Sequence, residues 1–211
     1  MSDFFITGTD TEIGKTYVTT ALLRDLRRRG LPAMGYKAIA CGDRSDARAM
    51  RDATDPSVSL ELINPLYLRA ATSPYIAATL ENRTISPKEL LSGYERLRES
   101  YGPILVEGAG GWEVPIAPGF TMADFAAALK LPVILVIGNK LGAVNHALMT
   151  LKGIRARGLE CRAMVLNHLQ QDWDTAALTN RRQIEEFAGM EIAAELIHGQ
   201  EDIDSQAVLG I

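Results

Sequence analysis

Short apolar runs alternate with longer segments of helical periodicity along most of the chain. The runs have the length of buried strands, whereas the longer segments place apolar residues three and four positions apart. The runs predicted to form strands are 4–6, 33–40, 103–107, 132–137 and 161–166. The segments predicted to form helices are 17–29, 86–101, 121–129, 141–157 and 175–187.

Strands that alternate with helices favour a parallel sheet, because a parallel pair needs a long crossover connection, which a helix usually supplies. We therefore predict an α/β fold with a doubly wound, mostly parallel sheet and helices on both faces. No internal repeat or linker divides the chain, so residues 1–211 are expected to form a single domain. Residues 42–71 are polar and weakly patterned, which indicates loops and short helices, and no structure is predicted for the tail 199–211.

The connection between the first strand and the first helix is punctuated by glycine and ends in Gly14-Lys15-Thr16. This order is typical of a P-loop, in which backbone N–H groups wrap phosphates and the helix N-terminus adds positive potential. Lys15 would neutralise the outer phosphates, and the Thr16 hydroxyl would bind Mg²⁺. The usual spacing places the first glycine at position 9, but here it is Gly8. We interpret the loop as a nucleoside triphosphate site. The alternative is that Gly-Lys-Thr occurs at the start of a helix by chance.

Composition limits the kinds of partner. The chain of 211 residues is 47% hydrophobic and 23% charged, with a net charge of −4, as in an ordinary soluble globular protein. This charge gives no sign of a nucleic-acid or membrane partner. The two cysteines provide no disulfide framework, and no apolar stretch approaches the ~20 residues of a membrane span. We expect a cytoplasmic protein.

Polar residues end several predicted strands, and the carboxyl ends of parallel strands meet at one edge of a sheet. Glu107 ends such a strand, and the glycines of 108–111 let backbone approach a ligand closely. A carboxylate at this place in a P-loop protein is a candidate Mg²⁺ contact, and a solvated carboxylate is the alternative. Asp46 is either a helix N-cap residue or a second carboxylate for the metal.

Other strand ends carry less specific signals. Lys37 is either a site lysine or a side chain that reaches the surface along an apolar strand. The pair Asn167-His168 ends another strand, and an asparagine there suits hydrogen bonding to a nucleobase. Cys41 and Cys161 are expected to be inert small apolar residues, and the histidines lack metal-ligand spacing.

Six segments together resemble the dethiobiotin synthetase family of P-loop NTPases. They are Gly8–Thr16, Gly35–Lys37, Thr72–Pro74, Val106–Trp112, Leu131–Val136 and Lys140–Ala147. The early glycine of the loop is itself a trait of that family. The resemblance runs in register from about residue 3 to Asn167 and is expected to fade after it.

The resemblance implies an ATP-dependent ligase that closes the ureido ring of dethiobiotin from 7,8-diaminononanoate and CO₂. One amine captures CO₂ as a carbamate, and the carbamate oxygen attacks the γ-phosphate to give a carbamic–phosphoric anhydride. The second amine then displaces phosphate and closes the ring. ATP is the implied co-substrate and Mg²⁺ the implied cofactor.

The family match also implies roles for individual residues. Those expected to act in catalysis are Lys15, Lys37 and Thr11. Those that match nucleotide contacts are Glu12, Ile13, Gly14, Lys15, Thr16, Tyr17, Asp46, Glu107, Gly108, Ala109, Gly110 and Asn167, the last toward adenine. The matches to Mg²⁺ contacts are Thr16, Asp46 and Glu107, and those to substrate contacts are Lys37, Cys41, Gly142 and Asn145.

The family is homodimeric, with each substrate site at the interface. Gly142 and Asn145, at the start of a helix, would therefore hold the carboxylate of a substrate bound to the partner subunit. Three departures stand out. Cys41 replaces a common serine, which leaves substrate affinity open, and His168 stands where aspartate occurs in the family. The segment 194–199 lacks a proline-containing base-binding loop, which leaves base selectivity open.

Two other functions remain open at this point. A related P-loop ligase that forms an amide on another acceptor would share the same loop. A partner-regulated ATPase switch of the partition or septum-positioning type usually has a lysine early in the loop, and Gly8–Thr11 contains none. A purely structural role would leave the glycine-rich edge unexplained.

Overall fold

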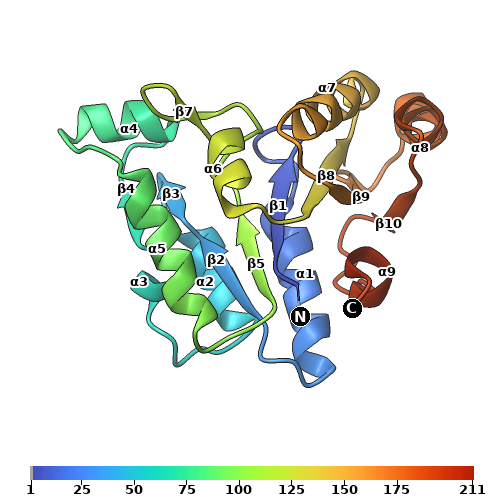
Figure 1. The fold of residues 1–211 in the computed structure, drawn as a ribbon. Coiled ribbons are helices and arrows are strands. Elements are labelled where there is room, and N and C mark those ends of the chain that lie inside the picture. The colour runs from blue at the N-terminus through green and yellow to red at the C-terminus, as the bar shows by residue number, and fades with distance from the viewer. Residues whose placement is uncertain (1) are drawn as a thin grey trace.

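The computed structural model describes residues 2–211 and is built around a six-stranded sheet (Figure 1). The strand order is β10-β9-β8-β1-β5-β2, and every adjacent pair is parallel. The strands are β1 (Phe4–Gly8), β2 (Met34–Lys37), β5 (Ile104–Glu107), β8 (Val133–Asn139), β9 (Cys161–His168) and β10 (Ile192–Leu196). The predicted parallel sheet is confirmed, and β1, which leads into the P-loop, lies between β8 and β5.

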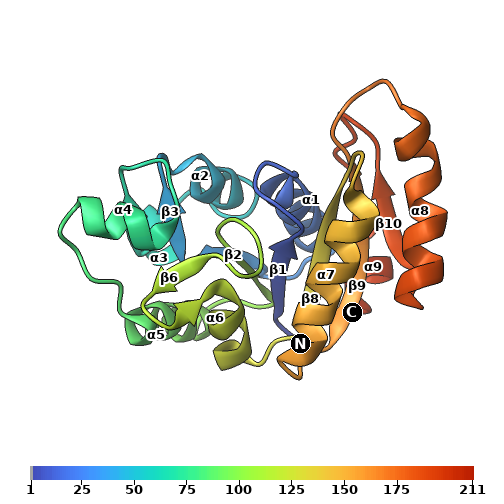
Figure 2. The same cartoon turned by 90° about the horizontal axis from the view of Figure 1, so that it is seen from above.

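Helices cover both faces of this sheet, as Figure 2 shows. They are α1 (Lys15–Arg28), α2 (Ser45–Asp52), α3 (Leu60–Ile63), α4 (Pro74–Leu80), α5 (Pro87–Arg98), α6 (Met122–Leu129), α7 (Ala143–Ala156), α8 (Thr175–Ala188) and α9 (Ser205–Leu209). Helices α1 and α2 lie on one face, whereas α5, α6 and α7 lie on the other. The predicted helices are confirmed, although the first begins at Lys15 rather than at Tyr17.

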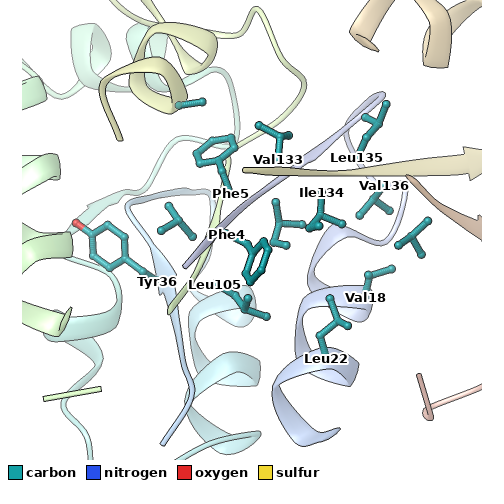
Figure 3. Packing of buried hydrophobic residues seen from close by; sticks show 14 of the residues in the cluster. Phe4, Phe5, Val18, Leu22, Tyr36, Leu105, Val133, Ile134, Leu135 and Val136 are labelled. Atoms are coloured by element: carbon teal, nitrogen blue, oxygen red, sulfur yellow. The ribbon is translucent and has the colours of Figure 1, made fainter. Parts of the chain in front are cut away.

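Apolar side chains on the two sides of the central strands form the core (Figure 3). On β1, Phe4 and Phe5 point to opposite sides, and Phe4 lies on the side from which Val18 and Leu22 of α1 approach. These four side chains are fully buried. The helical spacing of apolar residues thus packs α1 against the strand that precedes it, which holds the P-loop at both ends.

The prediction of one strand over 33–40 is wrong. The chain leaves the central sheet after Lys37, and the next strand, β3 (Ile39–Cys41), pairs in parallel with β4 (Leu66–Leu68) in a separate sheet. An apolar run cannot reveal such a change of partner, because both halves are buried. Strand β4 escaped prediction within 42–71 because it is short and only partly buried.

Other elements also differ from the prediction. An antiparallel hairpin of β6 (Pro115–Ala117) and β7 (Phe120–Thr121) follows the glycine run after β5. Strand β10 and helix α9 were not predicted, and β10 contains two alanines and one β-branched residue, a weak strand signal. The N-cap interpretation of Asp46 is wrong, because Arg44 is the N-cap residue and Asp46 lies in the first turn of α2.

Within residues 2–211, no helix has both the length and the apolar character needed to cross a membrane.

Candidate functional site

The P-loop joins β1 to α1, and close contacts explain its glycines. Gly14 has a φ of 84°, a left-handed conformation that favours glycine, and it immediately precedes the helix. A Cβ on Gly8 would lie 2.8 Å from Ile13 Cδ1 and 2.9 Å from Lys15 Cγ. The early position of the first glycine therefore gives the Lys15 side chain room to fold back over the loop.

Lys15 is buried, and its ammonium donates a hydrogen bond to the Asp10 carbonyl oxygen at 2.8 Å. Burial, with a further contribution from the charge of Lys37, lowers the pKa of Lys15 to about 8. The loop is thus closed by its own lysine, and a bound phosphate would replace the carbonyl as the partner of that ammonium. Glu12 has a φ of 58°, so the exposed part of the loop turns sharply there.

A buried charged cluster lies beside the loop. The parallel register of β2 and β5 places Lys37 opposite Glu107, and α2 contributes Asp46. Lys37 Nζ lies 2.7 Å from Glu107 Oε1 and 2.7 Å from Asp46 Oδ2. The Thr16 hydroxyl donates to the same Glu107 oxygen at 2.7 Å. Lys37 is only 4% exposed, so the alternative in which its side chain reaches the surface is wrong.

The opposite charges of the cluster stabilise the ionised forms of one another. Burial lowers the pKa of Lys37, but the carboxylates of Glu107 and Asp46 outweigh it and raise that pKa above its ordinary value. Burial raises the pKa of Asp46, but the ammonium of Lys37 outweighs it, and the net effect lowers that pKa. Lys37 and Asp46 are therefore both charged at neutral pH.

The oxygen atoms of this cluster suit Mg²⁺. A hydroxyl from Thr16 and carboxylates from Asp46 and Glu107 are the hard ligands that this ion prefers. Within residues 2–211, no group of three or more His, Cys, Asp or Glu side chains could hold a metal alone. Binding would therefore depend on nucleotide phosphates and water for the remaining ligands, as is usual for Mg²⁺. An ion placed there would compete with Lys37 for both carboxylates.

A cavity of about 530 Å³ opens next to the cluster. Its lining residues are Thr11, Glu12, Lys37, Ile39, Ala40, Cys41, Gly42, Asp43, Asp46, Ala71, Thr72, Ser73, Pro74, Ala109, Gly110 and Val114. Ile39, Pro74 and Val114 contribute apolar wall. The charged lining residues are Glu12, Lys37, Asp43 and Asp46. A short aliphatic chain with a polar end directed at Lys37 would fit this arrangement.

Part of this wall was expected from the sequence and part was not. Cys41 lines the cavity, and burial raises the pKa of its thiol to about 11, so it remains a neutral thiol. The segment Ala71–Pro74 was not predicted to be part of the site. The available signal was Thr72–Pro74, one of the segments that carry the family resemblance.

Asn167, at the end of β9, contacts the P-loop itself. Its Nδ2 donates to the Ile13 carbonyl oxygen at 2.9 Å, and a Cβ on Gly14 would lie 2.1 Å from the same nitrogen. The neighbouring His168 is buried, its Nε2 lies 2.6 Å from Glu195 Oε1, and its ring stacks on Trp173. The structure therefore gives Asn167 a contact with the loop backbone, and its contact with a nucleobase stays a prediction.

Two predicted substrate contacts lie apart from the cavity. Gly142 is the N-cap residue of α7, with a φ of 90°, and Asn145 is exposed in the first turn of that helix. Neither lines the cavity of its own chain. The start of α7 nevertheless lies near the P-loop, because Lys140 Nζ is 3.1 Å from Asp10 Oδ2.

One buried residue beside the cluster was missed. The hydroxyl of Thr19 lies 2.7 Å from Glu107 Oε2. Its position one helical turn after Lys15 and Thr16 was the only sequence signal, because residues four apart lie on the same face of a helix.

Solved structures of similar fold include a ParA family ATPase from Chlorobium tepidum and the MinD cell division protein from Aquifex aeolicus. The first has a TM-score of 0.59 at 14% identity and covers 100% of this chain and 90% of that one. The second has a TM-score of 0.60 at 14% identity, with 95% and 84% covered. At such identity the similarity shows the fold alone.

Sequence comparisons show the family as well as the fold. A family model described as an AAA domain matches residues 2–202. An ATP-dependent dethiobiotin synthetase BioD from Akkermansia muciniphila is 52% identical over 209 residues, which cover 99% of this chain and 98% of that protein. Another from Cellvibrio japonicus is 46% identical over 179 residues, with 80% and 78% covered. The match to the first relative spans nearly the whole chain and so extends past Asn167, where the resemblance is expected to fade. The chain therefore belongs to the dethiobiotin synthetase family.

Proposed function

We propose that this protein forms dethiobiotin from 7,8-diaminononanoate and CO₂ with ATP as co-substrate, a step of biotin biosynthesis. The observation that carries the proposal is the buried Lys37–Glu107–Asp46 cluster between the P-loop and the cavity. A nucleotide on the loop and an aliphatic diamine in the cavity would meet beside the Lys37 ammonium.

The reaction requires positive charge between two anions. One amine of the diamine captures CO₂ as a carbamate. The carbamate oxygen attacks the γ-phosphorus, the bond from that phosphorus to the bridging oxygen breaks, and ADP leaves. The second amine attacks the carbonyl of the resulting anhydride, phosphate leaves, and the ring closes. Lys15 and Lys37 would reduce the repulsion between carbamate and γ-phosphate. Binding the diamine beside ATP would also remove the entropy cost of bringing the reactants together during the reaction.

Other residues would position the reactants. Backbone N–H groups of Glu12–Thr16 would bind the phosphates, and Thr11, on the cavity wall, would hold the reacting groups. The residues Gly108–Gly110 would allow the ligand to approach backbone closely. Thr16, Asp46 and Glu107 would hold Mg²⁺, which supplies positive charge to the phosphates when bound.

We also infer the setting in which the site works. Residues 1–211 would act as one domain, which is supported by one buried apolar cluster extending from Phe4 to Leu209. The working form would be a cytoplasmic homodimer. Gly142 and Asn145 would contact the carboxylate of a substrate bound to the partner subunit, which is consistent with their absence from the cavity wall of their own chain.

A single assay tests the proposed reaction. Purified protein is mixed with Mg-ATP, bicarbonate and 7,8-diaminononanoate, and ADP and dethiobiotin are measured, the latter by mass spectrometry. Dethiobiotin is expected only in the complete mixture. ADP formed at the same rate with and without the diamine, and with no dethiobiotin, would indicate an ATPase or a ligase for another acceptor.

A further inference from the structure

The two oxygen atoms of the Glu107 carboxylate have different partners. Oε1 accepts hydrogen bonds from the Thr16 hydroxyl and the Lys37 ammonium, each at 2.7 Å, and so faces the proposed metal and substrate region. Oε2 faces the next turn of α1, where the Thr19 hydroxyl lies at 2.7 Å. Glu107 is 1% exposed and Thr19 is 0% exposed, so water does not compete for this contact.

The Thr19 proton has two possible acceptors. Its Oγ1 lies 2.9 Å from the Lys15 carbonyl oxygen and 2.7 Å from Glu107 Oε2, and a hydroxyl has one proton to donate. The carboxylate is nearer and charged, and charge-assisted hydrogen bonds are the shorter and stronger ones. The Thr19 hydroxyl therefore donates its proton to Glu107. This hydrogen bond fixes the rotation of the carboxylate about the Cγ–Cδ bond of Glu107.

We propose that Thr19 is a positioning residue of the metal and nucleotide site. Its hydroxyl holds Glu107 so that Oε1 faces Thr16, and without it Oε2 would lose the one side-chain hydrogen bond that it makes within residues 2–211. The inference rests on the proposed function in one respect, namely that Glu107 holds Mg²⁺. Partners that orient a metal-binding carboxylate typically change metal affinity or activity by about 10- to 100-fold when they are removed.

The neighbouring Thr20 provides a matched control. It is also buried in α1, and its hydroxyl donates to the Tyr17 carbonyl oxygen at 3.0 Å, away from Glu107. Thr19→Val and Thr20→Val make the same chemical change at adjacent positions. Any difference between the two variants therefore reports the contact with Glu107 rather than the loss of a helix hydroxyl.

The test measures how much the metal contributes to nucleotide binding. The affinity for the nonhydrolysable analogue AMP-PNP is measured by calorimetry in excess Mg²⁺ and again in EDTA, and the ratio of the two affinities is compared between proteins. Thr19→Val is expected to lower this ratio by about tenfold while affinity in EDTA stays unchanged. Thr20→Val and the hydroxyl-retaining Thr19→Ser should keep the wild-type ratio.

Other results would overturn the proposal. An unchanged ratio in Thr19→Val, or an equal loss of affinity in Mg²⁺ and EDTA, would show that Thr19 does not act through the metal site. A wild-type ratio near one would remove the metal role of Glu107 and the proposal with it. Thr19→Ala deletes the same hydroxyl if valine prevents folding. The readout needs no diamine, so failure of the proposed reaction would be a separate result.

Discussion

The ionised side chains of the site are already paired within the chain. Lys37 contacts Glu107 and Asp46, and Lys15 donates to the Asp10 carbonyl oxygen. Buried charges need such partners, because an unpaired one loses its hydration without compensation. Binding of substrates and metal would therefore exchange partners, and the two lysines are the groups that would change theirs.

Lys37→Met keeps the methylene stem and removes the charge that joins the two carboxylates. We expect dethiobiotin formation to be lost, and the free energy of unfolding to fall by about 3 kcal/mol because the buried Glu107 and the neighbouring Asp46 lose the cation that they share. Mg²⁺ should raise the melting temperature of the variant more than that of the wild type, because it can replace the missing cation. Lys152→Met, on the exposed side of α7, is the control for both assays. Turnover like that of the wild type would contradict the proposed role.

Asn167→Ala distinguishes a base contact from support of the loop. Because Asn167 Nδ2 donates to the Ile13 carbonyl oxygen, we expect the variant to bind both ATP and inorganic tripolyphosphate about tenfold more weakly. Asn167→Asp should be at least as weak, since it places an acceptor against that carbonyl. Calorimetry with the two ligands measures this. If ATP bound more weakly but tripolyphosphate did not, the contribution of Asn167 would be a contact with adenine and not support of the loop.

At the scale of elements, α1 is tied to the C-terminal segment by Asp25. Its Oδ2 accepts hydrogen bonds from the Ser205 amide and hydroxyl at 3.0 and 2.6 Å and from Arg29 Nε at 2.8 Å. Burial alone would raise the pKa of Asp25, but these bonds outweigh it and lower the pKa to about 2. The helix that begins at the P-loop is thereby attached at its other end to α9.

Asp25→Asn should lower the free energy of unfolding by about 1–2 kcal/mol at neutral pH. The folded pKa of Asp25 lies below its ordinary value of 3.8, so its contribution is complete above that pH and is lost as pH falls through about 2. The difference in free energy of unfolding between variant and wild type should therefore disappear in acid. Urea unfolding at several pH values measures this difference. Asp202→Asn is the control, because its side chain is 80% exposed and pairs only at the surface. A gap that persists at the lowest pH would contradict this.

The predictable and unpredictable parts of the fold differ in physical origin. Long apolar runs such as β8 identify a buried central strand from the sequence alone. The change of sheet between β2 and β3 was not predictable, because it depends on pairing with a distant strand. Likewise, local residue types marked Lys37 and Glu107 as candidates, but only the register of β2 and β5 shows that they form an ion pair.

At the scale of the whole molecule, the fold does not determine the reaction. The ParA and MinD structures share it at 14% identity, and a fold of this kind carries many activities. In this chain a cavity lies beside Lys37, and Leu141, Gly142 and Asn145 at the start of α7 are exposed. Around that start, Leu141 is 82% exposed and Met149 is 64% exposed, whereas Ala143 is buried. Large exposed apolar side chains around Asn145 suit a surface covered by a second copy.

A mixed dimer tests whether the site is shared between subunits. As pure proteins, Lys37→Met is expected to be inactive and Asn145→Ala to turn over slowly, since every site then lacks one contact. In a heterodimer of the two, isolated with two different tags, one site would combine Lys37 of one subunit with Asn145 of the other. The second site would lack both, so the heterodimer should have about half the wild-type turnover.

The result depends on where Asn145 acts and not on how strongly it binds. If it served the cavity of its own chain, both sites of the heterodimer would be defective, and turnover would stay at the level of the pure variants. Because Asn145 does not line that cavity, we expect activity to be restored. Sedimentation of each preparation confirms that dimers are compared with dimers. Restored activity would establish that the start of α7 completes the active site of the partner subunit.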